Sequence, residues 1–149
     1  MIKKIIVIAI VAVVAIIAGA IIFSMQRSST EAVPNVKFVS FGSDKQEIRV
    51  GESSNISFNV QNSEDRAISD ARIVIVIEPS GYEPYLLISN RTIDLPTLFS
   101  KDARTGDITI QITAAESPAK EAVYTVKAML FAEGVQSDIK QFDLKVRQE

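Results

Sequence analysis

The hydrophobic pattern along this chain changes character once, near residue 24. Residues 5–23 carry eighteen apolar side chains and one glycine, with no polar side chain among them. From residue 36 onward the apolar residues occur in short alternating runs that turn residues interrupt. The first pattern predicts a helix that spans a membrane, and the second predicts a β-rich domain in water.

The membrane helix also predicts an orientation. Nineteen helical residues extend roughly 28 Å, about the thickness of the hydrocarbon core of a bilayer. Lys3 and Lys4 precede the apolar run, and positive charge on a short N-terminal side favours a cytoplasmic N-terminus. We therefore expect residues 1–23 to be a cytoplasmic stub and an uncleaved transmembrane signal anchor, with the lipid bilayer as a partner through residues 5–23.

Two alternatives to the signal anchor stay open at the sequence level. The small residues Ala18, Gly19 and Ala20 resemble the cleavage site of a signal peptide, and cleavage there would release the remainder of the chain. A prepilin leader also begins with basic residues and a long apolar helix, but it needs a small residue after the basic pair, which this chain lacks.

The remainder of the chain divides into a linker and one domain. Residues 24–34 are rich in Ser and Thr and end in proline, which predicts a flexible linker. Residues 35–149 are the predicted extracytoplasmic domain, and the unbroken β-branched run at 73–77 predicts a central strand covered on both faces. The expected strands are a kinked opening strand over 36–50 and further strands at 56–60, 73–77, 86–95, 108–112, 124–130 and 142–146. Seven or eight short strands with hairpin-length connections predict an all-β, antiparallel β-sandwich.

Composition narrows the chemistry that this domain can perform. The 149 residues include no His and no Cys, which excludes a Ser-His-Asp triad, a thiol nucleophile, an imidazole or thiolate metal site and a disulfide. The formal net charge of -2 gives no basic footprint for nucleic acid. We expect a protein that is not an enzyme and binds no cofactor. A hydrolase with a carboxylate pair is a remote alternative, for which the sequence selects no pair.

One succession of residues resembles a known family. The sequence Val-Gly-Glu at 50–52 is followed by Ile-Ser-Phe-Asn-Val-Gln-Asn at 56–62. This order resembles the opening of CARDB-type adhesion-related domains, which are Ig-like modules of archaeal and bacterial surfaces. The run at 124–128 resembles the penultimate strand of a fibronectin type III domain. This resemblance implies an Ig-like sandwich in which Tyr124 takes the tyrosine-corner position, with a buried ring and a hydroxyl bonded to the backbone.

Two loops carry candidate partner contacts. Tyr82 and Tyr85 flank a turn rich in Pro and Gly, where two aromatic side chains either contact a partner or cover the end of the sandwich. Leu98 and Phe99 lie in the longest stretch without a clear period, residues 96–107, and either form a docking point or cap the core.

Other polar residues match weaker patterns. Asn55 and Asn90 begin Asn-x-Ser/Thr sequences, the acceptor pattern for N-glycosylation, which suits an external domain. Glu64, Asp65 and Asp70 gather in one predicted loop. They show no fixed ligand spacing, so a solvated loop is the simpler interpretation and a calcium site the alternative.

These observations lead to two hypotheses on function. The first is a non-enzymatic, single-pass cell-envelope protein whose outer sandwich binds a surface protein or an S-layer partner and tethers it near the membrane. The second is a subunit of a larger envelope machine or membrane complex. The layout of one membrane helix and one outer sandwich is similar to that of the archaellum stator proteins, which contact the S-layer. Both homo- and hetero-oligomers are compatible with the sequence.

Overall fold

The computed structural model describes residues 32–101 and 103–148, and these residues form an all-β domain of two sheets without a helix. The strands are β1 (Val36–Ser43), β2 (Glu47–Arg49), β3 (Ser53–Asn62), β4 (Ala71–Glu78), β5 (Leu86–Ile88), β6 (Thr92–Asp94), β7 (Ala103–Arg104), β8 (Ile108–Ala114), β9 (Glu121–Ala132) and β10 (Val135–Arg147). Within the described ranges, no helix is long and apolar enough to cross a membrane.

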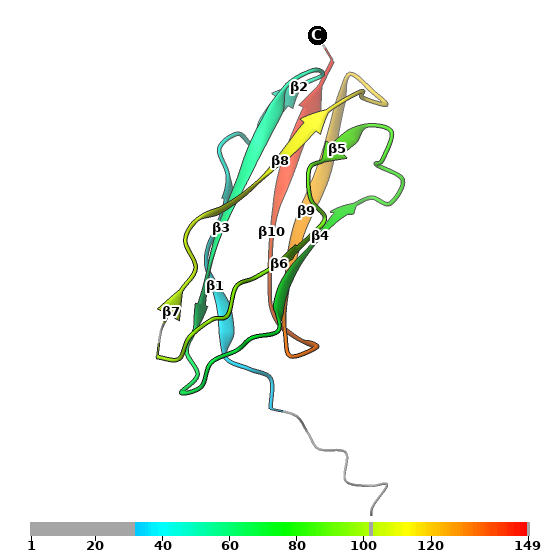
Figure 1. Cartoon of the computed structure of the whole chain (residues 1–149). Coiled ribbons are helices and arrows are strands. Elements are labelled where there is room, and N and C mark those ends of the chain that lie inside the picture. Colours follow the sequence, from blue (N-terminus) through cyan, green and yellow to red (C-terminus); the bar gives the residue numbers. More distant parts are fainter. Residues whose placement is uncertain (1–31, 102, 149) are drawn as a thin grey trace, which may run out of the picture. The chain divides into compact units, whose positions relative to one another are not determined.

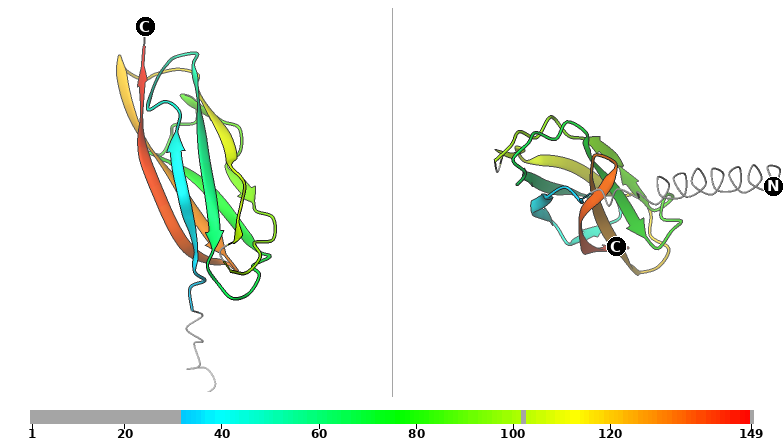
Figure 2. Two further views of the ribbon diagram at one scale, coloured as in Figure 1. Left: turned by 90° about the vertical axis from the view of Figure 1, so that its left-hand side faces the viewer. Right: turned by 90° about the horizontal axis from the view of Figure 1, so that it is seen from below.

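The two sheets form the two layers of a sandwich (Figures 1 and 2). The first sheet has the order β1-β3-β8-β5, and the two-residue β7 pairs with β3. The second sheet has the order β2-β10-β9-β4-β6. One core cluster joins apolar side chains from both layers, and Phe58, Ile73 and Leu130 are among its fully buried members. The predicted all-β sandwich is therefore confirmed.

The alternating runs form strands as predicted. Ile56, Phe58 and Val60 of β3 are fully buried, while the residues between them face outward. Because successive side chains of a strand point to opposite faces, alternation places every second residue in the core. The hairpin between β9 and β10 turns at Glu133 and Gly134, which both have positive φ, as a tight two-residue hairpin turn requires.

The predicted opening strand over 36–50 is wrong, because the chain changes sheets within it. β1 pairs antiparallel with β3, whereas β2 pairs parallel with β10 in the other sheet, so the sandwich is not purely antiparallel. The crossing is fixed by Asp44, whose Oδ1 accepts hydrogen bonds from Ser54 Oγ and from the backbone N–H of Asn55, both at 2.8 Å. The expected kink is a crossover between sheets.

Two further strand predictions need correction. The predicted strand over 86–95 divides into β5, which pairs with β8, and β6, which pairs with β4 in the other sheet. The run 73–77 forms β4, but Val74 and Val76 on its outer face are only half-buried. β-branched residues suit any half-buried sheet face, so the unbroken run did not require burial on both sides. These two divisions and the short β7 raise the strand number above the predicted seven or eight.

The predicted membrane span lies outside the described residues, as does the linker up to residue 31. The compact unit begins at Val33. Pro34, at the end of the predicted linker, is already buried, and its carbonyl oxygen accepts a hydrogen bond from Val36 N–H at 2.9 Å. The domain therefore starts within the last residues of the predicted linker.

Candidate functional site

The end of the sandwich at which β1 begins, called here the entry end, is organised around Asn62. This side chain is fully buried at the end of β3. Its Nδ2 donates to the carbonyl oxygens of Arg66, Leu98 and Phe99 at 2.9–3.0 Å, and its Oδ1 accepts from Glu64 N–H at 2.9 Å. One amide thus satisfies backbone groups of two loops that are far apart in sequence.

Asn62 is the main residue that the sequence interpretation missed. It ends the alternating run at 56–62 and begins a polar stretch over 62–66, so the polar pattern predicts only a loop residue there. The alternation itself indicates that Asn62 is buried. The even-numbered residues of β3 point into the core, and Asn62 continues that series with a polar side chain. A buried amide needs partners, and the neighbouring loops supply them.

The structure separates the predicted contact pair Leu98 and Phe99. Leu98 is 3% exposed and caps the core, with backbone hydrogen bonds to Ile68 of 2.8 and 2.9 Å. Phe99 is 69% exposed. Burial removes Leu98 from the surface that a partner could reach and leaves Phe99 on that surface.

The predicted contact pair Tyr82 and Tyr85 lies at the opposite end, called here the far end. Tyr82 is 7% exposed and lies under the guanidinium group of Arg91, at 5.3 Å from the ring centroid. Tyr85 is half-buried against the core, and its carbonyl oxygen accepts from Ala115 N–H at 2.8 Å. Both rings therefore mainly cover the end of the sandwich.

Tyr124 only partly follows the tyrosine-corner expectation. Its ring is 3% exposed, as expected. Its hydroxyl, however, has no hydrogen-bond partner within the described residues, so the expected bond to the backbone is wrong. Burial raises the pKa of this hydroxyl, and the neighbouring Tyr85 adds to the increase.

The two candidate glycosylation sites differ in environment. Asn55 is exposed near the start of β3, and its Nδ2 donates to Asp44 Oδ2 at 2.9 Å. The hydrogen bond from Ser54, with those from Asn55, holds the pKa of Asp44 below its ordinary value. Asn90 is exposed in the connection between β5 and β6. Of the two, only Asn90 therefore lies in a loop.

The acidic loop residues do not form a ligand set. Glu64 Oε1 accepts a hydrogen bond from Asn35 N–H, so this carboxylate holds the loop against the start of the domain. Asp65 and Asp70 are exposed. Within residues 32–101 and 103–148, no group of three or more acidic side chains could hold a metal ion.

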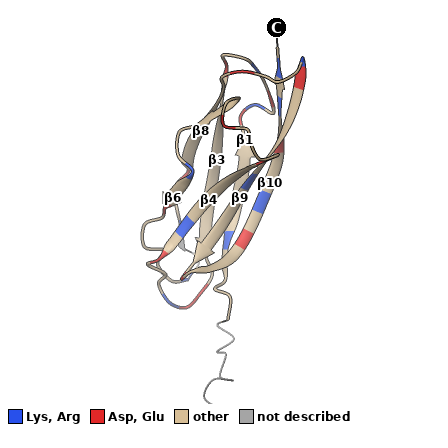
Figure 3. Ribbon diagram, turned by 90° about the vertical axis from the view of Figure 1, so that its right-hand side faces the viewer, with Lys and Arg blue, Asp and Glu red and all other residues tan. Residues whose placement is uncertain are grey.

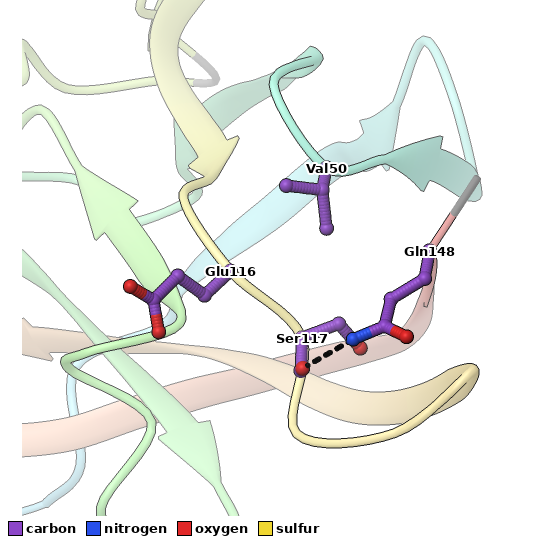
Figure 4. A pocket seen from close by; sticks show the side chains of 4 residues that line it. All are labelled: Val50, Glu116, Ser117 and Gln148. Carbon is purple, nitrogen blue, oxygen red and sulfur yellow. Dashed lines mark hydrogen bonds between the residues drawn. The ribbon is translucent and has the colours of Figure 1, made fainter.

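A shallow pocket at the far end is lined by Val50, Glu116, Ser117 and Gln148 (Figure 4). Gln148 Nε2 donates to the carbonyl oxygen of Ser117 at 3.0 Å. Glu116 is the single ionisable group among the described residues of the lining, so these residues supply no carboxylate pair of the kind that glycoside hydrolysis generally uses.

The outward face of the first sheet is uncharged over three strands. The side chains that point away from the core on β3, β5 and β8 are Ser53, Asn55, Ser57, Asn59, Gln61, Leu87, Thr109, Gln111 and Thr113. Ser53 Oγ lies 2.7 Å from Thr113 Oγ1, so the hydroxyl groups of neighbouring strands bond to each other. We call this surface the uncharged face.

The strands of the second sheet carry charged residues along their length (Figure 3), and the outward face combines ion pairs with apolar side chains. Lys127 Nζ lies 2.7 Å from Glu78 Oε2, and Lys145 Nζ lies 2.8 Å from Glu121 Oε1. Apolar side chains share this face with the ion pairs, and the half-buried or exposed ones are Val74, Val76, Val123, Met129, Phe131 and Ile139.

Comparison with known proteins places the fold. No protein-family model matches the chain, and no curated protein matches its sequence. The solution NMR structure of the CARDB domain of a Pyrococcus furiosus protein is similar, with a TM-score of 0.56 and 14% identity, over 78% of this chain and 97% of that one. A crystal structure of the same domain in complex with di-metal ions gives a TM-score of 0.55 and 14% identity, over 76% of this chain and 89% of that one.

A larger protein contains a similar sandwich. The alkylpurine DNA glycosylase of Pseudomonas fluorescens, bound to DNA with an abasic site analogue, matches with a TM-score of 0.50 and 14% identity, over 76% of this chain and 31% of that one. At such identities the likeness concerns the fold, because one sandwich architecture hosts many unrelated functions. The described domain has the fold of a CARDB-type β-sandwich.

Proposed function

We propose that this chain is a non-enzymatic, single-pass cell-envelope protein whose outer Ig-like sandwich binds a surface protein or S-layer component and tethers it to the membrane. Residues 5–23 would be the anchor, the N-terminus would be cytoplasmic, and the sandwich would lie outside the membrane. The observation that carries the binding role is the uncharged face of β3, β5 and β8.

An uncharged polar face suits a protein partner for an energetic reason. Interface cores are depleted of charged residues, because a charge that loses its hydration needs an excellent partner. Ser, Thr and Asn exchange hydrogen bonds with water for hydrogen bonds with a partner at lower cost. Leu87, which is 57% exposed beside Thr113, adds apolar area to the same face.

Site-specific photo-cross-linking in whole cells tests this assignment. A photoreactive residue replaces Gln111 on the uncharged face, and a matched one replaces Asp143 on the outward face of the second sheet. We expect one discrete cross-linked envelope protein from position 111 and none from position 143. Thr109→Lys should abolish the cross-link from position 111. A cross-link that survives this change would contradict the proposed binding face.

Orientation needs its own experiment. Protease added to intact cells should digest the sandwich, while a cytoplasmic marker protein stays intact. A sandwich that resists protease in cells and is cut in inverted vesicles would refute the proposed orientation.

A subunit of a larger envelope complex, for example a stator-like component, is the second candidate. The apolar side chains on the outward face of the second sheet favour it, because Val123 is 53% and Ile139 is 44% exposed there. A subunit packed between partners would use both outer faces. Discrete cross-links from both positions 111 and 143 would therefore favour the subunit over the simple tether.

A further inference from the structure

Phe99 is the most exposed large apolar side chain of the described residues. It is 69% exposed, compared with 57% for Leu87 and 56% for Val33. Its neighbour Leu98 is buried in the core, so the backbone directs one side chain inward and the next one outward. An exposed phenyl ring costs hydration free energy in the free domain, which a docking role would recover.

The backbone that presents Phe99 is fixed on both sides. Its carbonyl oxygen accepts the hydrogen bond from Asn62 Nδ2 at 3.0 Å. Two residues later, Lys101 N–H donates to the carbonyl oxygen of Glu64 at 3.0 Å. Lys101 has a φ of 62°, so the chain turns sharply after the ring. A side chain on a fixed backbone loses little conformational entropy when it binds.

Phe99 lies at the entry end, where the described chain begins. Ser63 N–H donates to the carbonyl oxygen of Asn35 at 3.0 Å, and Val36 pairs with Asn62 in the sheet. The loop that carries Phe99 and the start of β1 therefore share one end of the sandwich, opposite β2 and β5 (Figure 1).

Exposed basic residues follow Phe99 closely in the sequence. Lys101 and Arg104 are both exposed. Lys37 pairs with Gln61 across β1 and β3, and Gln61 pairs with Arg104 across β3 and β7, so Lys37 and Arg104 share one row of the first sheet.

Two of the acids at this end are engaged, whereas Asp65 and Asp70 are exposed. Glu64 accepts a hydrogen bond from Asn35 N–H, and Glu133 pairs with Arg66. An aromatic ring beside exposed cations is the composition that inserts into lipid headgroups.

The predicted linker is short enough to bring this end to the bilayer. Nine residues, 24–32, separate the predicted span from the start of the compact unit at Val33, and a flexible chain of nine residues has a root-mean-square end-to-end distance of roughly 17 Å. A ring within such a distance of the membrane surface has a high effective concentration there, so even a weak contact is populated.

We propose that Phe99, with Lys101 and Arg104 beside it, inserts into the anionic headgroup layer of the outer leaflet in which this chain is anchored. This inference rests on the proposed membrane anchor.

The chain offers a clean reporter, because it contains no tryptophan. Phe99→Trp therefore introduces one indole at the docking point, and Leu87→Trp introduces one at an exposed position on β5 toward the far end. The full chain is reconstituted in nanodiscs of phosphatidylcholine and phosphatidylglycerol, with and without lipids that are spin-labelled at the headgroup. We expect the indole emission of Phe99→Trp to shift to shorter wavelength and to lose intensity with the labelled lipids, whereas Leu87→Trp shows neither change.

A charge reversal sharpens the test. Lys101→Glu with Arg104→Glu, in the Phe99→Trp background, should reduce the quenching, and Lys120→Glu, an exposed control outside the entry end, should leave it unchanged. If the full chain floats with the lipid but the emission of Phe99→Trp matches that of Leu87→Trp, the docking proposal is wrong and the anchor stands. If the chain does not float with lipid, the anchor fails and the docking proposal fails with it.

Discussion

The two ends of the sandwich differ in the hydrogen bonding of their buried polar groups and in the burial of their aromatic rings. At the entry end a buried amide, Asn62, is hydrogen-bonded through both of its polar atoms, while an aromatic ring, Phe99, stays exposed. At the far end Tyr82 and Tyr124 are buried, and the Tyr124 hydroxyl lacks a partner within the described residues. The difference teaches that the loops determine burial here. Long loops at the entry end leave backbone groups that a side chain must satisfy.

Removing the amide of Asn62 should give the largest effect. In Asn62→Ala, the carbonyl oxygens of Arg66 and Phe99 and the N–H of Glu64 lose this partner, while the Leu98 oxygen keeps its bond from Ile68 N–H. We therefore expect the free energy of unfolding to fall by roughly 3 kcal/mol. Urea unfolding of residues 33–149, followed by tyrosine fluorescence, measures this change. Asn90→Ala in the exposed loop is the matched control and should change the value by less than about 0.5 kcal/mol. Equal effects at both positions would contradict the role of Asn62.

Leu98 and Phe99 at the entry end allow the stability effect of a buried side chain to be compared with that of an exposed one. Leu98→Ala leaves a cavity in the core and should cost roughly 2–4 kcal/mol. Phe99→Ala removes an exposed ring and should change the unfolding free energy by less than about 0.5 kcal/mol. The same urea titration measures both variants. A Phe99→Ala variant as unstable as Leu98→Ala would mean that the ring packs against the domain, which would also remove the basis for its docking role.

The sequence predicts the sandwich better than it predicts the ends. Alternation identifies β3, β8 and β9, because a half-buried strand must place every second side chain in the core. It does not identify the two crossovers between sheets, since the apolar residues on both sides of each crossover still point into the same core. The crossover at residues 44–46 depends on hydrogen bonds of Asp44, which pair it with residues ten and eleven positions later.

The candidate contacts were predicted as pairs, and the structure divides one of them. Periodicity fails in residues 96–107, so nothing in the sequence distinguishes Leu98 from Phe99. Their difference comes from the short bridge between Ile68 and Leu98 and from the Asn62 amide, which are contacts between distant segments. The cover of Tyr82 is likewise a contact between separate segments, because the guanidinium group of Arg91 lies over its ring.

The hydroxyl of Tyr124 gives the next test, because it is the counterpart of the satisfied amide of Asn62. Tyr124→Phe removes a buried hydroxyl without a partner in the described residues, so we expect stability unchanged or raised by up to about 1 kcal/mol. Tyr124→Ala, which also removes the buried ring, should cost roughly 3–5 kcal/mol. A loss above about 1 kcal/mol in Tyr124→Phe would show that the hydroxyl has a stabilising partner, and the far end would then resemble the entry end.

A fall in pH should slightly reduce the stability of the fold, through Glu133 at the entry end and Glu121 at the far end. The hydrogen bond from Arg66 lowers the pKa of Glu133 at the entry end, and the hydrogen bond from Lys145 lowers the pKa of Glu121 at the other end of β9. A carboxylate whose pKa is lower in the folded state stabilises the fold above its ordinary pKa, here about 4.5. That contribution is lost as the pH falls through the lower, folded value.

Because both pairs are exposed, the effect of each is small and screened by salt. We expect Glu133→Gln and Glu121→Gln each to reduce slightly the fall in melting temperature between about pH 7 and pH 3, relative to the unaltered chain, and molar salt to narrow that difference. Thermal unfolding at the two pH values measures it. Glu116→Gln, at a carboxylate without an ion pair among the described residues, is the control. If only Glu133→Gln has an effect, the ion pair that joins two loops stabilises more than the pair between adjacent strands, and the two ends differ in electrostatics as well as in burial.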